Sequence, residues 1–225
     1  MSLLGLDTST AAAAACVVRD DGRAFEIAAD PAALRRPPAH AAELMPAVAE
    51  VMERSGVGWG ELDGIAVGVG PGSFTGLRIG IATARALGVA GGLRLRPVSS
   101  LAALARGIEE VASGSVLLPL IDAKRGEVFA AAYEGDRELW PPFAASPEKL
   151  AERVDRAGLR PLAAGDGSIR FRGVLEMAGI RVAPDDSGAH VVRALHVCRL
   201  AAAAPGEPPE AVLPEYLRPP DAEPQ

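Results

Sequence analysis

The chain has 225 residues, enough for one large domain or two small ones, and 49% of them are hydrophobic. Its net charge of −6 and its aromatic content of 4% argue against unaided binding of RNA or DNA, which needs basic surfaces and stacking rings. No apolar run approaches the roughly 20 residues that a membrane-spanning helix needs, and the N-terminus lacks the basic start of a signal peptide. We therefore expect a cytoplasmic protein, with Cys16 and Cys198 as buried free thiols.

Strands and helices are predicted in two similar series along the chain. The expected strands span residues 3–6, 11–18, 24–28, 65–69, 116–121, 128–133 and 161–164, with a further strand end at 98–100. The expected helices span residues 39–54, 77–89, 101–111, 169–178 and 189–203. In each series an apolar strand ends at an aspartate, Asp7 or Asp122, and a short turn leads into another strand. The pattern predicts two α/β halves with a cleft between them, where strand-end loops bind ligands.

The most distinctive stretch is a glycine-rich loop, Gly68-Val-Gly-Pro-Gly-Ser-Phe-Thr-Gly-Leu-Arg78, between a strand and a helix. Its glycines allow sharp turns and close backbone approach. The loop lacks the Lys-Ser/Thr pair of a P-loop and the spacing of the dinucleotide fingerprint. It also lacks the Gly-x-Ser-x-Gly elbow of a serine hydrolase, so Ser73 and Thr75 are interpreted as an N-cap pair for the following helix.

The helices predicted at 39–54 and 77–89 carry wide apolar surfaces. Arg78 and Arg85 are the only charges in the second helix. A helix that is apolar on nearly every side must be covered on nearly every side, either by its own lobe or by a partner protein. Both interpretations stay open at this point.

No metal site is expected. The three histidines, His40, His190 and His196, are scattered and form no His-Glu-x-x-His motif. His40 is interpreted as a residue at a helix N-terminus that bonds to the backbone, and His190 and His196 as residues on different faces of one helix.

Taken together, the motifs resemble those of the TsaB (YeaZ) family. The blocks occur in that family's order: Leu4-Gly-Leu-Asp-Thr-Ser-Thr10, His40-Ala-Ala-Glu-Leu-Met-Pro46, the glycine-rich loop, Val98-Ser-Ser-Leu101, Ile121-Asp-Ala-Lys-Arg-Gly-Glu-Val128 and Pro214-Glu-Tyr-Leu-Arg218. They cover nearly the whole chain, and the block that ends at Arg78 is the most specific.

The resemblance implies an α/β protein with the actin/Hsp70-like ATPase (ASKHA) fold, made of two ribonuclease-H-like lobes. We expect an N-terminal lobe with partner-binding helices at 1–100, a C-terminal lobe at 101–205 whose last helix can pack back on the first lobe, and a proline-rich tail at 206–225.

The resemblance also implies a role without catalysis. TsaB-like chains bind TsaD, the paralogue that places threonylcarbamoyl on N6 of adenosine 37 in tRNAs reading ANN codons, and the ATPase TsaE joins the complex. We expect tRNA contact only through that complex, a homodimer when the chain is alone, and no cofactor of its own, with ATP or ADP at the interface of the complex left open.

Two sets of candidate residues follow. The expected partner-binding residues are Leu44, Val48, Val51, Met52, Ser73, Phe74, Arg78, Ala82 and Arg85. The candidates for a degenerate nucleotide site are Asp7, Thr8, Ser9, Gly165 and Asp166, which either face Mg²⁺ and phosphate or merely close turns. The alternative functions are an independent small-molecule kinase or ATPase of the actin-like superfamily and, with no support from the residues, a glycoprotease.

Overall fold

The computed structural model describes residues 1–217, and its strands form two sheets. The first sheet contains β1 (Leu3–Asp7), β2 (Ala14–Val18), β3 (Ala24–Ile27), β4 (Gly64–Gly70) and β5 (Leu95–Ser99) in the order β3-β2-β1-β4-β5. The second contains β6 (Val116–Lys124), β7 (Glu127–Glu134), β8 (Arg137–Ala145), β9 (Leu162–Ala164) and β10 (Arg181–Val182) in the order β10-β9-β6-β7-β8.

The two sheets have the same topology. In each, the first strand pairs antiparallel with the second and parallel with the fourth, as β1 does with β2 and β4 and as β6 does with β7 and β9. The third strand continues the antiparallel side, and the fifth continues the parallel side. The repeat predicted from Asp7 and Asp122 is therefore a duplicated lobe.

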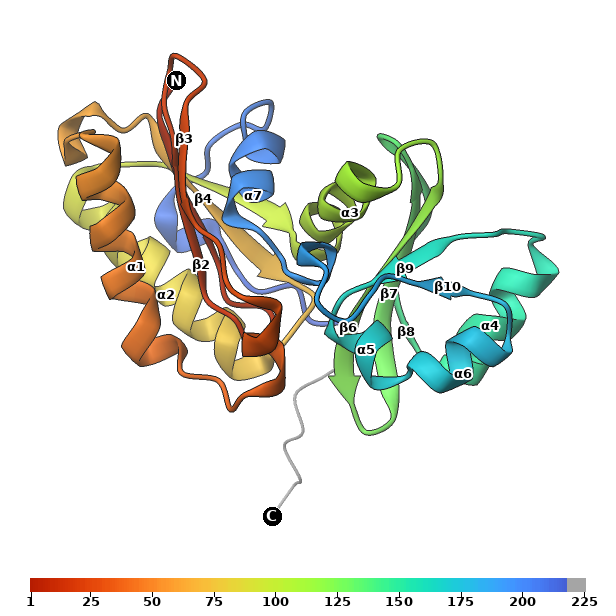
Figure 1. Cartoon of the computed structure of the whole chain (residues 1–225). Coiled ribbons are helices and arrows are strands. Elements are labelled where there is room, and N and C mark those ends of the chain that lie inside the picture. Colours follow the sequence, from red (N-terminus) through yellow and green to blue (C-terminus); the bar gives the residue numbers. More distant parts are fainter. Residues whose placement is uncertain (218–225) are drawn as a thin grey trace.

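Helices separate and enclose the sheets (Figure 1). The α-helices are α1 (His40–Ser55), α2 (Phe74–Gly91), α3 (Ser100–Val111), α4 (Pro147–Arg156), α5 (Asp166–Arg170), α6 (Arg172–Met177) and α7 (Ala194–Ala201). Short 3₁₀ helices are η1 (Pro31–Arg35), η2 (Trp59–Glu61), η3 (Gly188–His190) and η4 (Pro209–Ala211). Helices α1 and α2 cover the face of the first sheet that points away from the second lobe, while α3 and α7 lie between the sheets.

Alternation along the strands explains why both faces of the first sheet are covered. Leu4 and Leu6 point to α1 and α2 in one core cluster, whereas Leu3 and Cys16 point to α7 in another. This second cluster continues through α3 into Leu117 and other residues of the second sheet. A third cluster lies beyond that sheet, under α4 and α6. The layered core fixes the position of the strand ends that border the cleft.

Several predicted elements differ from the observed ones. Helix α2 begins at Phe74, so Ser73 alone is its N-cap, accepting a hydrogen bond from Gly76 N at 3.2 Å, and Thr75 lies inside the helix. The segment predicted as a helix at 189–203 is η3 followed by α7, so His190 and His196 do not share a helix. Residues 169–178 fall in two short helices, and α4 and β8 were not predicted. Pro141 and Pro142 argue against a strand in the sequence, because proline cannot donate a ladder hydrogen bond. Strand β8 accommodates them because it lies at the edge of its sheet.

Four residues assigned to partner binding need correction. Leu44, Val48, Val51 and Met52 are buried in the first lobe's own core, where α1 packs on β2 and β3. Their helical spacing identified the apolar face of α1. It did not show whether that face points to the protein's own core or to a partner, because both environments favour the same apolar side chains. The other assigned residues, Ser73, Phe74, Arg78, Ala82 and Arg85, are exposed or half-buried on or beside α2.

The prediction for the two cysteines agrees with the structure. Cys16 and Cys198 are free and buried, and the Cys198 thiol donates to the Leu3 carbonyl oxygen at 3.7 Å. The described part of the tail, up to Leu217, follows the surface of the first lobe, and the rest of the predicted tail, including Arg218, lies outside the described residues. Within residues 1–217, none of the helices has the length and apolar character that crossing a bilayer would require.

Candidate functional site

The glycine-rich loop packs directly on the loop that follows β1. A Cβ atom at Gly72 would overlap the Ser9 carbonyl oxygen, and one at Gly76 would overlap the Thr8 carbonyl oxygen. The contact is closed by hydrogen bonds from Ser73 N to Ser9 O at 2.7 Å and from Thr8 Oγ1 to Gly76 O at 2.8 Å. The glycines therefore serve a close approach between two backbone segments of the same lobe rather than a phosphate cradle.

Asp7 lies beneath this contact and is almost completely buried. Its Oδ1 accepts hydrogen bonds from Ser9 N at 2.8 Å and Ser9 Oγ at 2.6 Å, and its Oδ2 accepts one from Ser100 Oγ at 2.8 Å. Burial raises the pKa of Asp7 above its usual value, and these hydrogen bonds offset part of that rise. Gly68 leaves the space that the Asp7 carboxylate fills. Both oxygens of Asp7 are thus used inside the lobe.

His40 supports the same loop. Its Nε2 donates to the Thr10 carbonyl oxygen at 2.7 Å, which is the backbone bond expected of a histidine at a helix N-terminus. His190 plays a similar part in the second lobe, where its Nδ1 accepts from Gly165 N at 3.0 Å and its Nε2 donates to the Pro184 carbonyl oxygen at 2.9 Å. Both rings hold backbone segments at strand ends.

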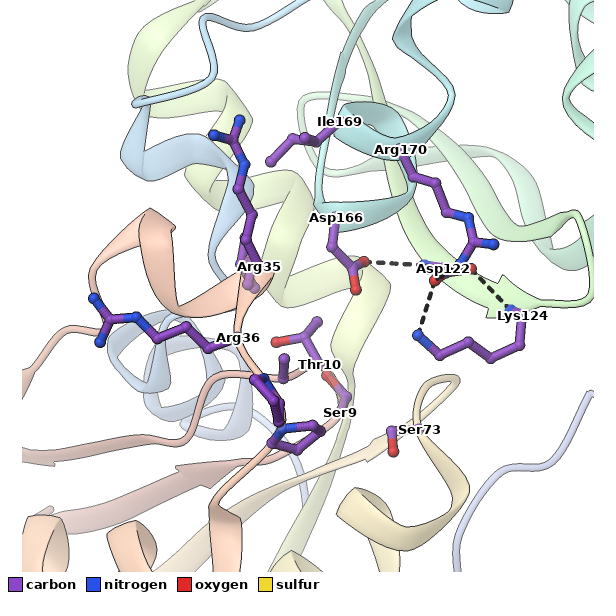
Figure 2. Close-up of a pocket in the computed structure, with 14 residues that line it drawn as sticks. Ser9, Thr10, Arg35, Arg36, Ser73, Asp122, Lys124, Asp166, Ile169 and Arg170 are labelled. Atoms are coloured by element: carbon purple, nitrogen blue, oxygen red, sulfur yellow. Dashed lines mark hydrogen bonds and ion pairs between the residues drawn. The ribbon is translucent and has the colours of Figure 1, made fainter.

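The second lobe brings four charged side chains to the cleft (Figure 2). Asp122 Oδ2 pairs with Lys124 Nζ and with Arg170 Nη1, each at 2.8 Å, and Asp122 N donates to Asp166 Oδ1 at 2.9 Å. Burial would raise the pKa of Asp122, but the hydrogen bonds and charges of Lys124 and Arg170 outweigh it, and the pKa is lowered. Burial raises the pKa of Asp166 to about 6. The strand-end carboxylate of the second lobe is therefore neutralised by the protein's own cations.

The cleft between the lobes has a volume of about 450 Å³. Its lining residues are Ser9, Thr10, Ala11, Leu34, Arg35, Arg36, Pro37, Pro38, Ser73, Asp122, Lys124, Asp166, Ile169 and Arg170. Of the predicted nucleotide candidates, Ser9 and Asp166 line it, whereas Asp7, Thr8 and Gly165 are buried behind it. Asp122 and Lys124 belong to the block 121–128 that contributed to the family resemblance. The sequence did not predict their place in the cleft, because the ion pair with Arg170 joins segments that are far apart in the chain.

This donor set does not fit a magnesium–nucleotide complex. Hard cations take carboxylate oxygens as ligands, yet Asp7 bonds to Ser9 and Ser100, and Asp122 bonds to Lys124 and Arg170. Within residues 1–217 there is no group of three or more His, Cys, Asp or Glu side chains placed to hold a metal ion.

A second candidate surface is the outward face of α1 and α2, on the side of the lobe opposite the second sheet (Figure 1). Between the charged residues of α1, its exposed apolar residues include Ala41, Ala42, Met45 and Ala49, and those of α2 include Phe74, Ala82, Ala86, Val89 and Ala90. Met45 is 44% exposed and Val89 is 73% exposed. We call these nine residues the helix face, and small side chains dominate it, which permits close helix packing.

The duplicated topology and the cleft between the lobes define the class: this is an α/β protein of the actin/Hsp70-like ATPase (ASKHA) fold, with two ribonuclease-H-like lobes. A family model described as TsaD, tRNA N6-adenosine threonylcarbamoyltransferase, matches residues 36–150. A crystal structure from Pseudomonas aeruginosa, of an uncharacterized protein with similarity to peptidase YeaZ, superposes with a TM-score of 0.81. It is 30% identical in sequence, over 96% of this chain and 99% of that chain.

A second structure, YeaZ from Pseudomonas aeruginosa, has the same TM-score of 0.81 at 28% identity, with 96% of this chain and 99% of that chain covered. The chain belongs to the TsaB (YeaZ) family, which is related to the formation of threonylcarbamoyladenosine in tRNA. Among curated protein sequences, none matches it significantly.

Proposed function

We propose that this chain is a non-catalytic subunit that binds and activates a TsaD-type catalytic paralogue in the threonylcarbamoylation of N6 of adenosine 37 in tRNAs reading ANN codons. The observation that carries the proposal is the helix face: two neighbouring helices expose small and apolar side chains on the outside of a lobe whose own core is already complete. Exposed apolar patches of this kind mark protein interfaces.

The cleft supports a role without catalysis. Its carboxylates are held by internal donors, since Asp7 accepts hydrogen bonds from Ser9 and Ser100, and Asp122 accepts them from Lys124 and Arg170. We therefore assign no cofactor to this chain, and place any ATP or ADP at the interface of the complex. The alternative hypothesis is an independent kinase or ATPase. Under that hypothesis the purified chain would release phosphate from ATP, and the Asp7→Ala variant would lose this activity.

The rest of the assembly follows from the same reasoning. The negative net charge leaves contact with tRNA to the partner. A TsaE-like ATPase would join the pair in the cytoplasm. In the absence of the paralogue, the helix face would pair two copies of this chain.

The test uses two exposed methionines. Met45, on the helix face, is 44% exposed, and Met177, on α6 of the second lobe, is 85% exposed. We expect Met45→Asp to weaken binding to the purified paralogue by at least about 100-fold, because a desolvated charge at the centre of an apolar interface costs several kcal/mol. Met177→Asp is the matched control and should bind normally.

Isothermal titration of each variant with the paralogue measures the effect, and tRNA modification assayed with each component omitted tests the role. Normal binding by both Met45→Asp and Ala82→Asp would contradict the proposal. The buried Val48 is unsuitable for such a test, because an aspartate there would disrupt the core of the lobe.

A further inference from the structure

The segment 205–217 near the C-terminus is anchored to the first lobe alongside α2. Glu207 and Leu95 exchange backbone hydrogen bonds of 2.7 and 2.9 Å at the edge of the first sheet. Helix η4 then packs on α2, Val212 is buried in the core between α2 and the sheet, and Glu215 N donates to the Val69 carbonyl oxygen at 2.8 Å. These anchors fix the backbone of residues 207–215 on the surface of the lobe.

The anchored segment nevertheless points large apolar side chains outward. Leu213 is 64% exposed, and Tyr216 and Leu217 are each 37% exposed. Backbone hydrogen bonds and the buried Val212 already hold this segment in place. The exposed side chain of Leu213 adds little to the free energy of folding, because it buries little apolar area. Exposed apolar groups next to another apolar surface instead indicate a shared contact area.

At the N-terminal end of α2 the segment meets the helix face. The rings of Tyr216 and Phe74 have centroids 5.1 Å apart, and the guanidinium carbon of Arg78 lies 3.8 Å from the Phe74 ring centroid. Arg78 Nε donates to Tyr216 Oη at 3.1 Å. Within residues 1–217, no carboxylate pairs with Arg78. The guanidinium is therefore held in one orientation while its outer N–H groups stay available to a partner.

We propose that Leu213, Tyr216 and Leu217 form a third strip of the docking surface, beside α2, and that the catalytic paralogue contacts this strip together with the helix face. Arg78 would meet a carboxylate of the paralogue. The inference rests on the proposed function and deepens it, because it adds to the interface a segment outside the two helices.

A different partner subunit fits this strip better than a second copy. Helix α2 contains Arg78 and Arg85 and no acidic residue. A homodimer formed through the helix face would bring these arginines toward their counterparts, so it would be weaker than a pair with the paralogue. A paralogue that presents aliphatic side chains and an acidic residue satisfies both the apolar strip and Arg78.

The test measures binding of the full chain to the purified paralogue. We expect Leu213→Asp and Tyr216→Ala each to weaken binding by at least about tenfold, as truncation of interface anchors does. Tyr216→Phe, which keeps the ring and removes the acceptor for Arg78, should have a smaller effect. Val111→Asp, an exposed apolar position at the end of α3, is the control and should bind normally. Thermal unfolding of each variant verifies that the fold is retained.

The outcomes separate the two proposals. Loss of binding in Met45→Asp with normal binding in Leu213→Asp and Tyr216→Ala would overturn the third strip and leave the proposed function standing. Normal binding in Met45→Asp and Ala82→Asp would instead contradict the proposed function itself. If Leu213→Asp and Tyr216→Ala abolished only self-association and bound the paralogue normally, the strip would belong to a homodimer, and the inference would be wrong.

Discussion

Two neighbouring aspartates at the cleft have opposite pKa shifts, and the difference comes from their partners. Asp122 is buried, but Lys124 and Arg170 stabilise its charge and lower its pKa. Asp166 accepts a hydrogen bond from Asp122 N, yet burial and the nearby charge of Asp122 raise its pKa to about 6. The sequence identified both residues as strand-end aspartates. It could not rank their acidity, because Arg170 and the depth of burial depend on how the second lobe folds.

At this scale we predict that Asp166→Asn stabilises the protein in a pH-dependent way. The pKa of Asp166 rises from its ordinary 3.8 to about 6 on folding. As pH increases through this window, the unfolded chain ionises first and the folded state loses stability, and the loss is complete above pH 6. Asparagine keeps an acceptor for Asp122 N and removes the charge. Its advantage over the wild type should grow by up to about 3 kcal/mol between pH 4 and pH 7.

Urea denaturation at several pH values measures this difference, with Asp155→Asn, an exposed change on α4, as the control. A difference between Asp166→Asn and the wild type that stays constant from pH 4 to pH 7 would contradict the assigned shift.

Among the secondary-structure elements, α2 depends most on its glycines. Gly76 lies against the Thr8 carbonyl oxygen and Gly80 against the Thr8 hydroxyl. The sequence predicted that the glycines of the loop, Gly76 among them, allow close backbone approach, and it identified the strand-loop-helix order. It did not reveal what they pack against, because Thr8 lies 68 residues before Gly76 in the chain. The apolar face of α1 was likewise recognised while its direction, toward β2 and β3, was not.

We predict that Gly76→Ala destabilises the protein by at least about 3 kcal/mol, because the new methyl group would overlap backbone atoms of the adjacent loop. Gly173→Ala is the matched control. Gly173 is also a helical glycine, but a methyl group there would point into open space, so alanine should stabilise the protein by up to about 1 kcal/mol. Thermal and urea unfolding of both variants check the pair, and similar stabilities for the two would refute the close approach.

In the whole molecule, the two lobes share one core. Helices α3 and α7 pack on each other between the sheets, and a single cluster of buried residues runs from Leu3 in the first sheet to Leu117 in the second. Helix α7, near the end of the chain, packs on β1 and β2 of the first lobe. The lobes are therefore joined by a continuous hydrophobic layer and not only by a linker.

We predict that Leu104→Ala lowers the free energy of unfolding by about 2–5 kcal/mol and keeps a single unfolding transition. Leu104 is fully buried on α3 within the shared cluster. Differential scanning calorimetry of wild type and variant measures both quantities. Two separate transitions in the wild type, only one of which shifts in the variant, would show that the lobes unfold independently.

The sequence by itself determined the local and repeated features of this protein. Apolar periodicity predicted most strands and helices, the aspartates at 7 and 122 revealed the duplication, and the glycine-rich loop together with the other blocks identified the family. Tertiary structure alone decided which side of each helix meets a core, which donors satisfy each carboxylate, and which helix surfaces stay exposed. Those properties depend on contacts between residues far apart in the chain, and a periodic pattern records that a side chain is apolar without recording what covers it.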